Sequence, residues 1–579
     1  MEPIDIDINT IGSPADIKRL DIDGLRLLSE ELRTALIKKL GANGGHVGPN
    51  LGVVEATVAL HYVFDAPDDL LVFDVSHQTY VHKMLTGRIG AFTDPAHYHD
   101  VTGYTSPAES PYDLFEIGHT STSISLATGL AKARDLQGGD YNVVAFIGDA
   151  SLGGGQGLEG LDYAPELGSN IIIVLNDNQM SIAENHGALY HHLKELRDTN
   201  GTAANNIFKA LGYEYMYVND GNNLHDLIEA FRAAKGAGHA VLVHINTMKG
   251  MGLPVAERDK ETFHYHAPFD LKSGMPLHPM GESYTDIYAM HLLGRMHDDP
   301  RIVAMTAGTP GASGWTPERR RLAGKHFVDV GICEQDEVGM AAGLARGGIR
   351  PVVGLVSTFM QRAYDQMSHD VAINNLPVTI VTFYNGIYGM NDVTHLGWFD
   401  IPFALHIPNY TVLAPATAED YTAMIDWAVN HADGPVIIRT PGGNVAHGDA
   451  LAVEHVTKWQ ITRQGDGDTA IIAVGEMLAT ANEAAAIMAK EGRNATVVYP
   501  RCLSTLDTDV MGQLKSYRHV ITLEGGVATG GFGQAVAAAL APSSVKVTVL
   551  GLKKEFLDRY NATEVLQANG MTPQQIAAL

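Results

Sequence analysis

Two apolar runs, each followed by oxygen-bearing side chains, constrain the fold of this chain more than any other feature. Val143–Ile147 indicates a buried parallel strand and is followed by Gly148, Asp149 and a glycine-rich turn. Ile171–Leu175 indicates a second strand, which ends in Asn176-Asp177-Asn178. Asp149 and Asn178 are about one βαβ unit apart in sequence. The pattern predicts two strands side by side in an α/β sheet, with oxygen ligands at one edge.

The residues at this predicted edge suit a diphosphate bridged by a metal ion. Carboxylate and amide oxygens are the hard ligands that Mg²⁺ takes together with substrate phosphates. The glycines after Asp149 would let backbone N–H groups approach an anion at a helix N-terminus. Asp149 or Asn178 alone is better explained as a turn residue after a strand. The pair, at this spacing, favours the diphosphate site.

The stretch resembles the thiamine diphosphate motif, GD-G followed about thirty residues later by N, with Ala150 where the motif usually has Gly. Further segments resemble the 1-deoxy-D-xylulose-5-phosphate synthase family of the transketolase superfamily. They are GGHVGPNLGVVE, DVSHQTYVHKMLTGR, IGHTSTSIS, NDNQMSIAENHGAL, VSTFMQRAYDQMSHDVAINNLP and THLGWFD. The resemblance covers nearly all 579 residues.

The resemblance implies an α/β fold of three domains, two doubly wound sheets that bind thiamine diphosphate and a C-terminal transketolase-like domain. We expect a domain for the diphosphate and Mg²⁺ at residues 1–275, a pyrimidine-binding domain at 282–442 and the last domain at 460–579, with linkers at 267–281 and 443–466. Apolar runs predict further strands at 70–75, 241–245, 302–306, 328–331, 378–383, 410–413, 436–439, 469–474, 496–499, 519–523 and 545–550. Helices are predicted at 23–40, 125–134, 284–296, 338–345, 357–370 and 418–430.

Composition excludes some classes of function. A net charge of −26 argues against a surface that binds nucleic acid. Two cysteines, Cys333 and Cys502, give no disulfide framework, and the acidic start MEPIDIDINT lacks the features of a signal peptide. With no transmembrane run in the sequence, we expect a cytoplasmic protein that binds small molecules and neither nucleic acid nor membrane. The family resemblance implies a homodimer.

Three histidines, His46, His77 and His119, follow Gly or Ser in loops that open helices or close strands. A single histidine in a loop is more often solvated or capping. Three of them at element ends of one domain favour a substrate site. The sequence around them has no cysteine or carboxylate pattern that would indicate zinc.

By resemblance, each site residue has an expected role. Asp149, Asn178 and the backbone oxygen of Met180 would hold Mg²⁺ on the diphosphate. The residues lining the cofactor would be His77, Gly118, His119, Thr120, Ala150, Ser151, Asn178, Phe359 and Glu334. Proton transfer and hydrogen bonds to substrate would come from His46, His264 and His395, whose ordinary pKa lies near working pH. Substrate contacts are expected from Arg362, Asn391 and Tyr384.

Glu334 carries the main catalytic expectation. In the family a carboxyl group hydrogen-bonds the aminopyrimidine ring of the cofactor, and an apolar pocket raises its pKa towards the protonated form. The alternative is a glutamate favoured at a helix N-terminus by the helix dipole. The other motifs favour catalysis.

The acceptor end departs from the family. This chain has Val356 in place of a tyrosine before the STF motif, Tyr384 in place of the arginine of an RAG motif, Asn391 in place of an aspartate, and Gly442 in place of the arginine of a PRG motif. A charge-assisted Arg–phosphate bond contributes about 1.5–3 kcal/mol, so losing two costs about 3–6 kcal/mol, roughly 10²–10⁴ in binding. The acceptor is therefore expected to be unphosphorylated or held differently.

The expected function is that of a thiamine diphosphate-dependent transferase, a carboligase that decarboxylates pyruvate and joins the two-carbon unit to an aldehyde. In the family the aldehyde is D-glyceraldehyde 3-phosphate and the pathway is isoprenoid biosynthesis. Two alternatives stay open: transketolase-type transfer of a two-carbon ketol, and a cofactor-binding paralogue without catalysis. The glycine-rich segment Glu524–Ala535 is weak evidence for a phosphate site and is better explained by helix packing.

Overall fold

The computed structural model describes residues 7–279 and 281–579, which form two compact units. Residues 7–279 with Gly331–Cys333 make the first unit, and residues 281–330 with 334–579 make the second. Residues 1–6 of the acidic start and residue 280 of the predicted linker lie outside the described residues. Each unit is described by itself.

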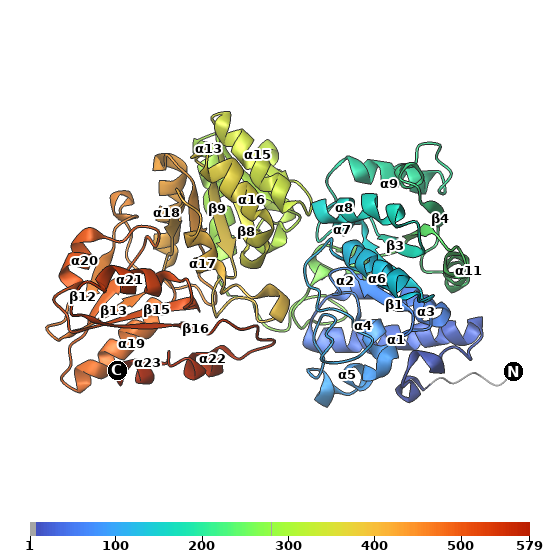
Figure 1. Ribbon diagram of the computed structural model, residues 1–579, viewed down its shortest axis with the longest axis horizontal. Helices are drawn as coiled ribbons and strands as arrows, with labels where there is room; N and C mark the ends of the chain where they lie inside the picture. The colour runs from blue at the N-terminus through green and yellow to red at the C-terminus, as the bar shows by residue number, and fades with distance from the viewer. Residues whose placement is uncertain (1–6, 280) are drawn as a thin grey trace. The chain divides into compact units, whose positions relative to one another are not determined.

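The first unit is built on a parallel sheet of order β1-β2-β3-β5-β4, of which β1, β3 and β4 are labelled in Figure 1. Its strands are β1 (Leu70–Phe73), β2 (Val143–Gly148), β3 (Ile171–Asp177), β4 (Glu214–Val218) and β5 (Ala240–Asn246). Apolar side chains of β2 and β3 alternate between two cores. Helices α1 (Ile22–Asn43), α3 (Val54–Val63) and α11 (Leu224–Lys235) contribute to one core, and α6 (Ser123–Gln137), α8 (Gly155–Tyr163) and α9 (Ala188–Asp198) to the other. The sheet is therefore covered on both faces, as predicted.

The second unit contains two sheets. The first is parallel, of order β10-β11-β9-β8-β6-β7, with β6 (Ile302–Thr306), β7 (Phe327–Asp329), β8 (Arg350–Val356), β9 (Thr379–Phe383), β10 (Thr411–Leu413) and β11 (Val436–Arg439). Helices α13 (Tyr284–Asp298) and α18 (Ala418–His431) share one core with it. Helix α15 (Glu334–Arg346) packs on the other core, beside β8 (Figure 1).

The last sheet has the order β12-β14-β13-β15-β16. Its strands are β12 (Gln460–Arg463), β13 (Thr469–Ala473), β14 (Thr496–Tyr499), β15 (His519–Val527) and β16 (Lys546–Leu552), and only β12 is antiparallel to its neighbour. Helices α19 (Met477–Lys490) and α21 (Phe532–Leu540) pack on it. The buried Arg439 links the two sheets, since it donates to Asp400 (2.5 Å) and to Glu476 (2.6 Å). Three α/β sheets are thus present, as predicted.

Short helices complete the fold. They are α2 (Val47–Leu51), α4 (Tyr80–Lys83), α5 (Gly90–Thr93), α7 (Asp149–Leu152), α10 (Ile207–Ala210), α12 (Pro254–Arg258), α14 (Pro317–Ala323), α16 (Tyr364–Gln366), α17 (Asp400–Leu405), α20 (Thr508–Leu514), α22 (Ala562–Ala568) and α23 (Pro573–Ala577). Both cysteines are free thiols. Within the described ranges, no helix has the length and apolar character needed to cross a membrane.

Several predicted elements differ from the observed ones. The strand expected at 70–75 ends at Phe73, because Val75 (φ 57°) and Ser76 (φ 64°) adopt left-handed backbone conformations. The helix expected at 357–370 is irregular: a 3₁₀-helix (Ser357–Ala363), then α16, then a π-helix (Met367–Ala372). The helix expected at 338–345 begins earlier, at Glu334 itself.

The glycine-rich segment after β15 serves packing, as interpreted from the sequence. The carboxylate of Glu524 accepts the backbone N–H groups of Phe532 (3.0 Å) and Gly533 (2.9 Å) and so caps helix α21. A Cβ atom at Gly531 would lie 2.5 Å from Oε2 of Glu524. Glycine is therefore required there for the carboxylate to reach the helix end.

Candidate active site

The two strand ends singled out by the sequence are neighbours. Strands β2 and β3 pair in parallel, with Gly148 opposite Asn176, so Asp149 and Asn178 follow adjacent strands at one edge of the sheet. Asp149 opens helix α7 and is buried. The backbone N–H of Met180 donates to Oδ1 of Asn178 (3.1 Å), which closes a tight turn with Gln179 at φ 66°.

The buried side chain of Asp149 lies among other polar and charged groups. Nδ2 of Asn185 donates to its Oδ2 (2.8 Å). Burial and the neighbouring carboxylate of Asp177 raise the pKa of Asp149 well above its ordinary value. Asp177 itself accepts from His244 (2.9 Å) and from Arg197. A dication beside Asp149 would offset the cost of burying its carboxylate, so this donor set fits Mg²⁺.

Lys249, which sequence reasoning missed, adds a buried cation to this edge. Its Nζ donates to the carbonyl oxygens of Ser181 (2.6 Å) and Ile182 (3.4 Å). Burial lowers the pKa of Lys249 to about 7, and the carboxylate of Asp149 acts in the opposite direction. No group of three or more His, Cys, Asp or Glu side chains able to hold a metal occurs within residues 7–279 and 281–579. A metal here therefore needs amide, carbonyl and phosphate oxygens as well, which agrees with a diphosphate site.

The loop before α6, which carries Gly118, His119 and Thr120, is fixed by Asp74. The buried carboxylate of Asp74 accepts the backbone N–H groups of Ser121 (2.8 Å), Thr122 (2.8 Å) and Ser123 (2.9 Å) and so caps the helix.

The same loop contacts helix α7. Ser121, with φ 72°, donates through Oγ to the carbonyl of Ser151 (2.7 Å), and the carbonyl of Ala150 accepts from Tyr190 (3.3 Å). A Cβ at Gly154 would lie 2.2 Å from Oγ of Ser121, so only glycine allows this approach. The predicted cofactor-lining residues of the loop and of α7 are therefore brought to one place.

Three predicted histidines meet in the first unit. The ring centroid of His77 lies 4.9 Å from that of His46 and 5.2 Å from that of His264, and the rings of His46 and His264 are 5.8 Å apart. The buried Asn50 fixes two of the loops, because its Nδ2 donates to the carbonyls of both His46 (2.7 Å) and His77 (2.7 Å). The loops that carry His46 and His77 thus converge with the segment that carries His264.

Burial shifts the pKa of two of the predicted histidines, His264 and His395. Burial, reinforced by Lys249 and the neighbouring histidines, lowers the pKa of His264 well below its ordinary value. Burial also lowers the pKa of His395 to about 4. Burial therefore favours the neutral form of both imidazoles, which can donate one hydrogen bond and accept another.

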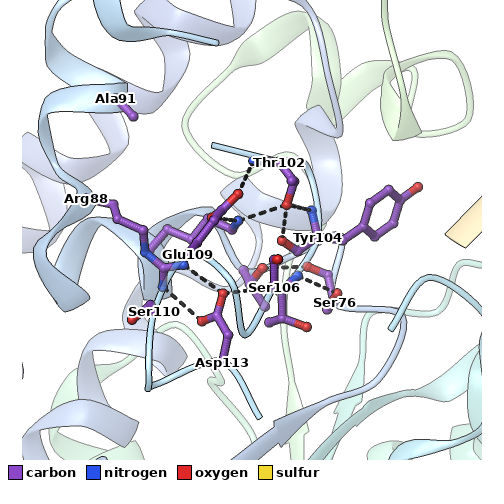
Figure 2. A network of polar contacts seen from close by, with 12 residues as sticks. Ser76, Arg88, Ala91, Thr102, Tyr104, Ser106, Glu109, Ser110 and Asp113 are labelled. Carbon is purple, nitrogen blue, oxygen red and sulfur yellow. Dashed lines mark hydrogen bonds and ion pairs between the residues drawn. The ribbon is translucent and has the colours of Figure 1, made fainter. Parts of the chain in front are cut away.

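A buried ionic network holds an aromatic side chain against this cluster. Figure 2 shows Arg88 contacting Asp113 (2.7 and 2.9 Å) and Glu109 (3.2 Å), and Glu109 accepting the backbone N–H of Thr102 (2.5 Å). The ring of Tyr104 points away from the network (Figure 2) and lies with its centroid 5.7 Å from that of His46. The segment 102–113 therefore positions Tyr104 beside the histidines.

In the second unit, Glu334 lies at the first position of α15 and is 3% exposed. Burial raises its pKa, as expected, and Arg362 acts against this shift. NH1 of Arg362 lies 3.7 Å from Oε2 of Glu334. The position of Glu334 at the N-terminus of α15 also agrees with the alternative, in which the helix dipole favours a glutamate there.

Phe359 and His395 lie together in the second unit. Their ring centroids are 5.6 Å apart in an edge-to-face arrangement, and Oγ1 of Thr394 lies 2.9 Å from Nδ1 of His395. The structure therefore groups Glu334 with Arg362 and Phe359 with His395, all from the segments that the sequence singled out.

The positions at which the sequence departs from the family motifs are closely packed or engaged with other groups. A Cβ at Gly442 would lie 2.7 Å from the carbonyl oxygen of Asn385 and 2.8 Å from the backbone nitrogen of Gly389, so no arginine fits there. Tyr384 has φ 58° and its hydroxyl donates to the carbonyl of Ala312 (3.4 Å). Asn391 is exposed and donates to the carbonyl of Tyr560 (3.4 Å).

Sequence reasoning missed four residues that build the site: Asp74, Lys249, Asn50 and Tyr104. Two of them carry a local signal. Asp74 directly follows an apolar run, much as Asp149 follows one after a single glycine, and Lys249 lies in the glycine loop after β5. Asn50 and Tyr104 act through contacts between distant segments and leave no such signal.

Comparison with known proteins defines the class first. Family models match at residues 8–205 (1-deoxy-D-xylulose-5-phosphate synthase), 281–447 (transketolase, pyrimidine binding domain) and 457–576 (transketolase, C-terminal domain). A solved transketolase from Campylobacter jejuni is 16% identical, with 96% of this chain and 99% of that chain covered and a TM-score of 0.44. The chain is a thiamine diphosphate-dependent transferase of the transketolase type.

The curated relatives narrow this class. The 1-deoxy-D-xylulose-5-phosphate synthase of Desulforudis audaxviator is 39% identical, with 98% of this chain and 96% of the relative covered. That of Symbiobacterium thermophilum is 38% identical, with 98% and 94% covered. The chain therefore belongs to the 1-deoxy-D-xylulose-5-phosphate synthase family.

Proposed function

We propose that this enzyme decarboxylates pyruvate and joins the two-carbon unit to an aldehyde that it does not hold through the family's phosphate-binding arginines. One observation supports the altered acceptor above all others: the backbone at Gly442 leaves no room for any side chain. The second lost arginine position, Tyr384, has its hydroxyl engaged with the carbonyl of Ala312. The residue types that the family motif calls for at the cofactor, in contrast, are retained in the sequence at Asp149, Asn178 and Glu334.

In this proposal the edge of the first sheet holds the diphosphate of the cofactor. Asp149, Asn178 and the backbone oxygen of Met180 are the proposed ligands of Mg²⁺, and Lys249 adds positive charge. When bound, thiamine diphosphate supplies a carbon nucleophile and an electron sink for the loss of CO₂ from a 2-keto acid. Glu334 is proposed to exchange a proton with the aminopyrimidine ring, for which a raised pKa is suited.

The histidines are proposed to act on the substrate oxygens. Because His264 and His395 are neutral, each can donate one hydrogen bond through the protonated ring nitrogen and accept another. His46 and His77, in the same cluster as His264, would share this role. His77 would also line the cofactor, together with the loop from Gly118 to Thr120.

Arg362 and Asn391 are proposed substrate contacts. Arg362 is the one arginine among the expected substrate residues, so it is the proposed anchor for any anionic group that the acceptor or the 2-keto acid carries. A role in isoprenoid biosynthesis and a homodimer are also proposed, on the family resemblance alone, and a cytoplasmic location is proposed from the sequence.

The test is product identification. The protein is incubated with thiamine diphosphate, Mg²⁺ and labelled pyruvate, with D-glyceraldehyde 3-phosphate in one tube and unphosphorylated glyceraldehyde in another. We expect CO₂ release and a higher kcat/KM for the unphosphorylated aldehyde. A higher kcat/KM for D-glyceraldehyde 3-phosphate than for unphosphorylated glyceraldehyde would refute the proposed change of acceptor. The proposed carboligase activity would not be affected by that result.

Two other outcomes separate the remaining functions. Transfer of a two-carbon unit from a ketose phosphate without CO₂ release would indicate a transketolase-type reaction. Failure of the cofactor-loaded protein to consume any 2-keto acid or ketose phosphate would indicate a cofactor-binding protein without catalysis. Glu334→Gln is the variant that tests the catalytic role, with loss of at least a hundredfold in kcat expected, about 2.7 kcal/mol.

A further inference from the structure

The loop that follows β9 carries two of the residues proposed to contact the substrate, Asn391 and His395. It spans residues 384–399, between β9 and α17. The backbone N–H of Gly386 donates to the carbonyl of Gly397 (2.9 Å), which closes the base of the loop. The position of His395 therefore depends on what holds the residues between these two glycines.

Both ends of this loop are packed into the core of the last domain. Ile387, Leu396 and Trp398 are buried, and they share one apolar core with side chains of β13, β15 and α19. The backbone N–H of Val527 on β15 donates to the carbonyl of Trp398 (2.9 Å). The loop is therefore attached to the last domain, although it starts from a strand of the preceding sheet.

Tyr560, in the segment between β16 and α22, binds the first part of the loop. Its hydroxyl donates to the carbonyl of Ile387 (2.9 Å) and lies 3.4 Å from the carbonyl oxygen of Met390. The ring centroid of Tyr560 lies 4.9 Å from that of Trp398. Because Ile387 and Trp398 stand near opposite ends of the loop, this one side chain contacts both ends.

Asp558 and Arg559 bind the second part of the loop. The backbone N–H of Arg559 donates to the carbonyl of Asn391 (2.8 Å), and Oδ1 of Asp558 accepts the backbone N–H of Val393 (3.1 Å). Val393 opens the 3₁₀ turn that ends at His395. Arg559 has φ 47°, a conformation that a non-glycine residue keeps only where the surrounding structure requires it. Asp558 therefore holds the turn that presents His395.

We propose that residues 558–560 are a positioning segment for the acceptor end of the active site. They hold the loop in the form that places His395 beside Phe359 (5.6 Å between ring centroids), so the loop is ordered before the aldehyde binds. Order that exists before binding lowers the entropy cost that binding must meet. The inference rests on the proposed function, in which this loop contacts the substrate. It gives the last domain a part in acceptor binding and none in the activation of the cofactor by Glu334.

Tyr560→Phe tests the segment with a small change, because it removes the hydroxyl and keeps the ring beside Trp398. The net contribution of one hydrogen bond changes an equilibrium by about two- to tenfold. A loop that is correctly placed only part of the time lowers the apparent affinity for the aldehyde by the same fraction. We expect KM for the aldehyde to rise about two- to tenfold in Tyr560→Phe, and about tenfold or more when Asp558→Ala is added.

The first test uses the cofactor-free protein. Hydrogen–deuterium exchange is followed by mass spectrometry in peptides that cover residues 386–397, for the wild type, Tyr560→Phe and Asp558→Ala. Tyr517→Phe is the matched control, because Tyr517 is half-buried in the same domain and its hydroxyl lies 2.8 Å from Oγ1 of Thr496. We expect exchange in these peptides to be about two- to tenfold faster in the first two variants and unchanged in the control.

The second test uses the cofactor-loaded enzyme. KM is measured for pyruvate and for whichever of glyceraldehyde and D-glyceraldehyde 3-phosphate has the higher kcat/KM, and exchange of the C2 proton of thiamine diphosphate is followed by NMR. In Tyr560→Phe and Asp558→Ala we expect KM for the aldehyde to rise, while KM for pyruvate and the rate of C2 exchange stay as in the wild type. Asp558→Asn keeps an oxygen that can accept the N–H of Val393, so it should restore most of the affinity that Asp558→Ala loses.

The outcomes are distinguishable. Faster exchange with an unchanged KM for the aldehyde would overturn the proposal, because the segment would then only stabilise the fold. Unchanged exchange would also overturn it, since the loop would be held by other contacts. A fall in C2 exchange as large as the change in KM would do the same, because the segment would then act on the whole site. These three results leave the proposed function intact, whereas a wild type that consumes no 2-keto acid would overturn the proposed function and this inference together.

Discussion

Asp74→Asn is the substitution that most directly tests how the fold positions the cofactor loop. Asp74 uses two oxygens to accept three backbone N–H groups at the start of α6, from Ser121, Thr122 and Ser123. An asparagine keeps one acceptor oxygen and places an NH₂ group where the other oxygen was. The best rotamer retains the bonds from Thr122 and Ser123 and turns the NH₂ group against the N–H of Ser121.

The magnitude follows from these bonds. Leaving the buried N–H of Ser121 unsatisfied costs about 1–3 kcal/mol, and the two remaining bonds lose their charge assistance, about 0.5–1.5 kcal/mol each. Against this, burial raises the pKa of Asp74, so its carboxylate carries a desolvation cost that the neutral amide avoids. We therefore expect a net loss of about 1–3 kcal/mol, concentrated at the turn that carries Gly118, His119 and Thr120.

The assay measures thermal unfolding and cofactor affinity together. Asp74→Asn should melt several degrees below the wild type. Its Kd for thiamine diphosphate should rise about tenfold, because part of the binding free energy is then used to order the loop. Asp140→Asn, an exposed change in the same unit, is the control. An Asp74→Asn protein with unchanged melting and unchanged affinity would refute the capping argument.

Three further predictions follow from the geometry. Gly442→Arg should destabilise the second unit by about 1–3 kcal/mol, measured by calorimetry, and should not raise kcat/KM for the phosphorylated aldehyde. A higher kcat/KM for that aldehyde would contradict the steric argument. Asp149→Asn should raise the Mg²⁺ concentration for half-maximal activity at least about tenfold in a chelator titration, and an unchanged titration would remove Asp149 from the metal site. Burial raises the pKa of Glu524 to about 7, so the wild type should lose stability as the pH rises from about 4.5 through about 7. Glu524→Gln should lose less over the same range. If the melting temperature falls by the same amount in both proteins between pH 5.5 and pH 8, this prediction is wrong.

The parallel sheets could be predicted because their central strands are long apolar runs that end in polar turn residues. Since parallel strands present their carboxyl ends at one edge, the adjacency of Asp149 and Asn178 followed from the sequence alone. Strands β4 and β12 were missed because they lie at sheet edges and are partly exposed. Strand β8 was missed because Pro351 and Gly354 interrupt its apolar run.

The convergence of the histidines could not be predicted in the same way. It depends on Asn50, which ties together two loops distant in sequence, and on left-handed conformations at Val75 and Ser76. A β-branched residue at positive φ contradicts local preference and persists only where the surrounding structure requires it. The burial that lowers the pKa of His264 and of His395 could not be predicted either, because it depends on the packing of distant segments.

Two of the positions that depart from the family motifs lie in loops that follow neighbouring strands. Strands β9 and β11 pair in parallel, and Tyr384 and Gly442 come shortly after their ends. The missing Cβ of Gly442 is what lets the loop after β9 approach, at Asn385 and Gly389. Gly389 in turn has no room for a Cβ beside the carbonyl of Tyr384. An arginine introduced at position 442 alone therefore meets the loop after β9, so a side chain there requires that loop to be exchanged as well.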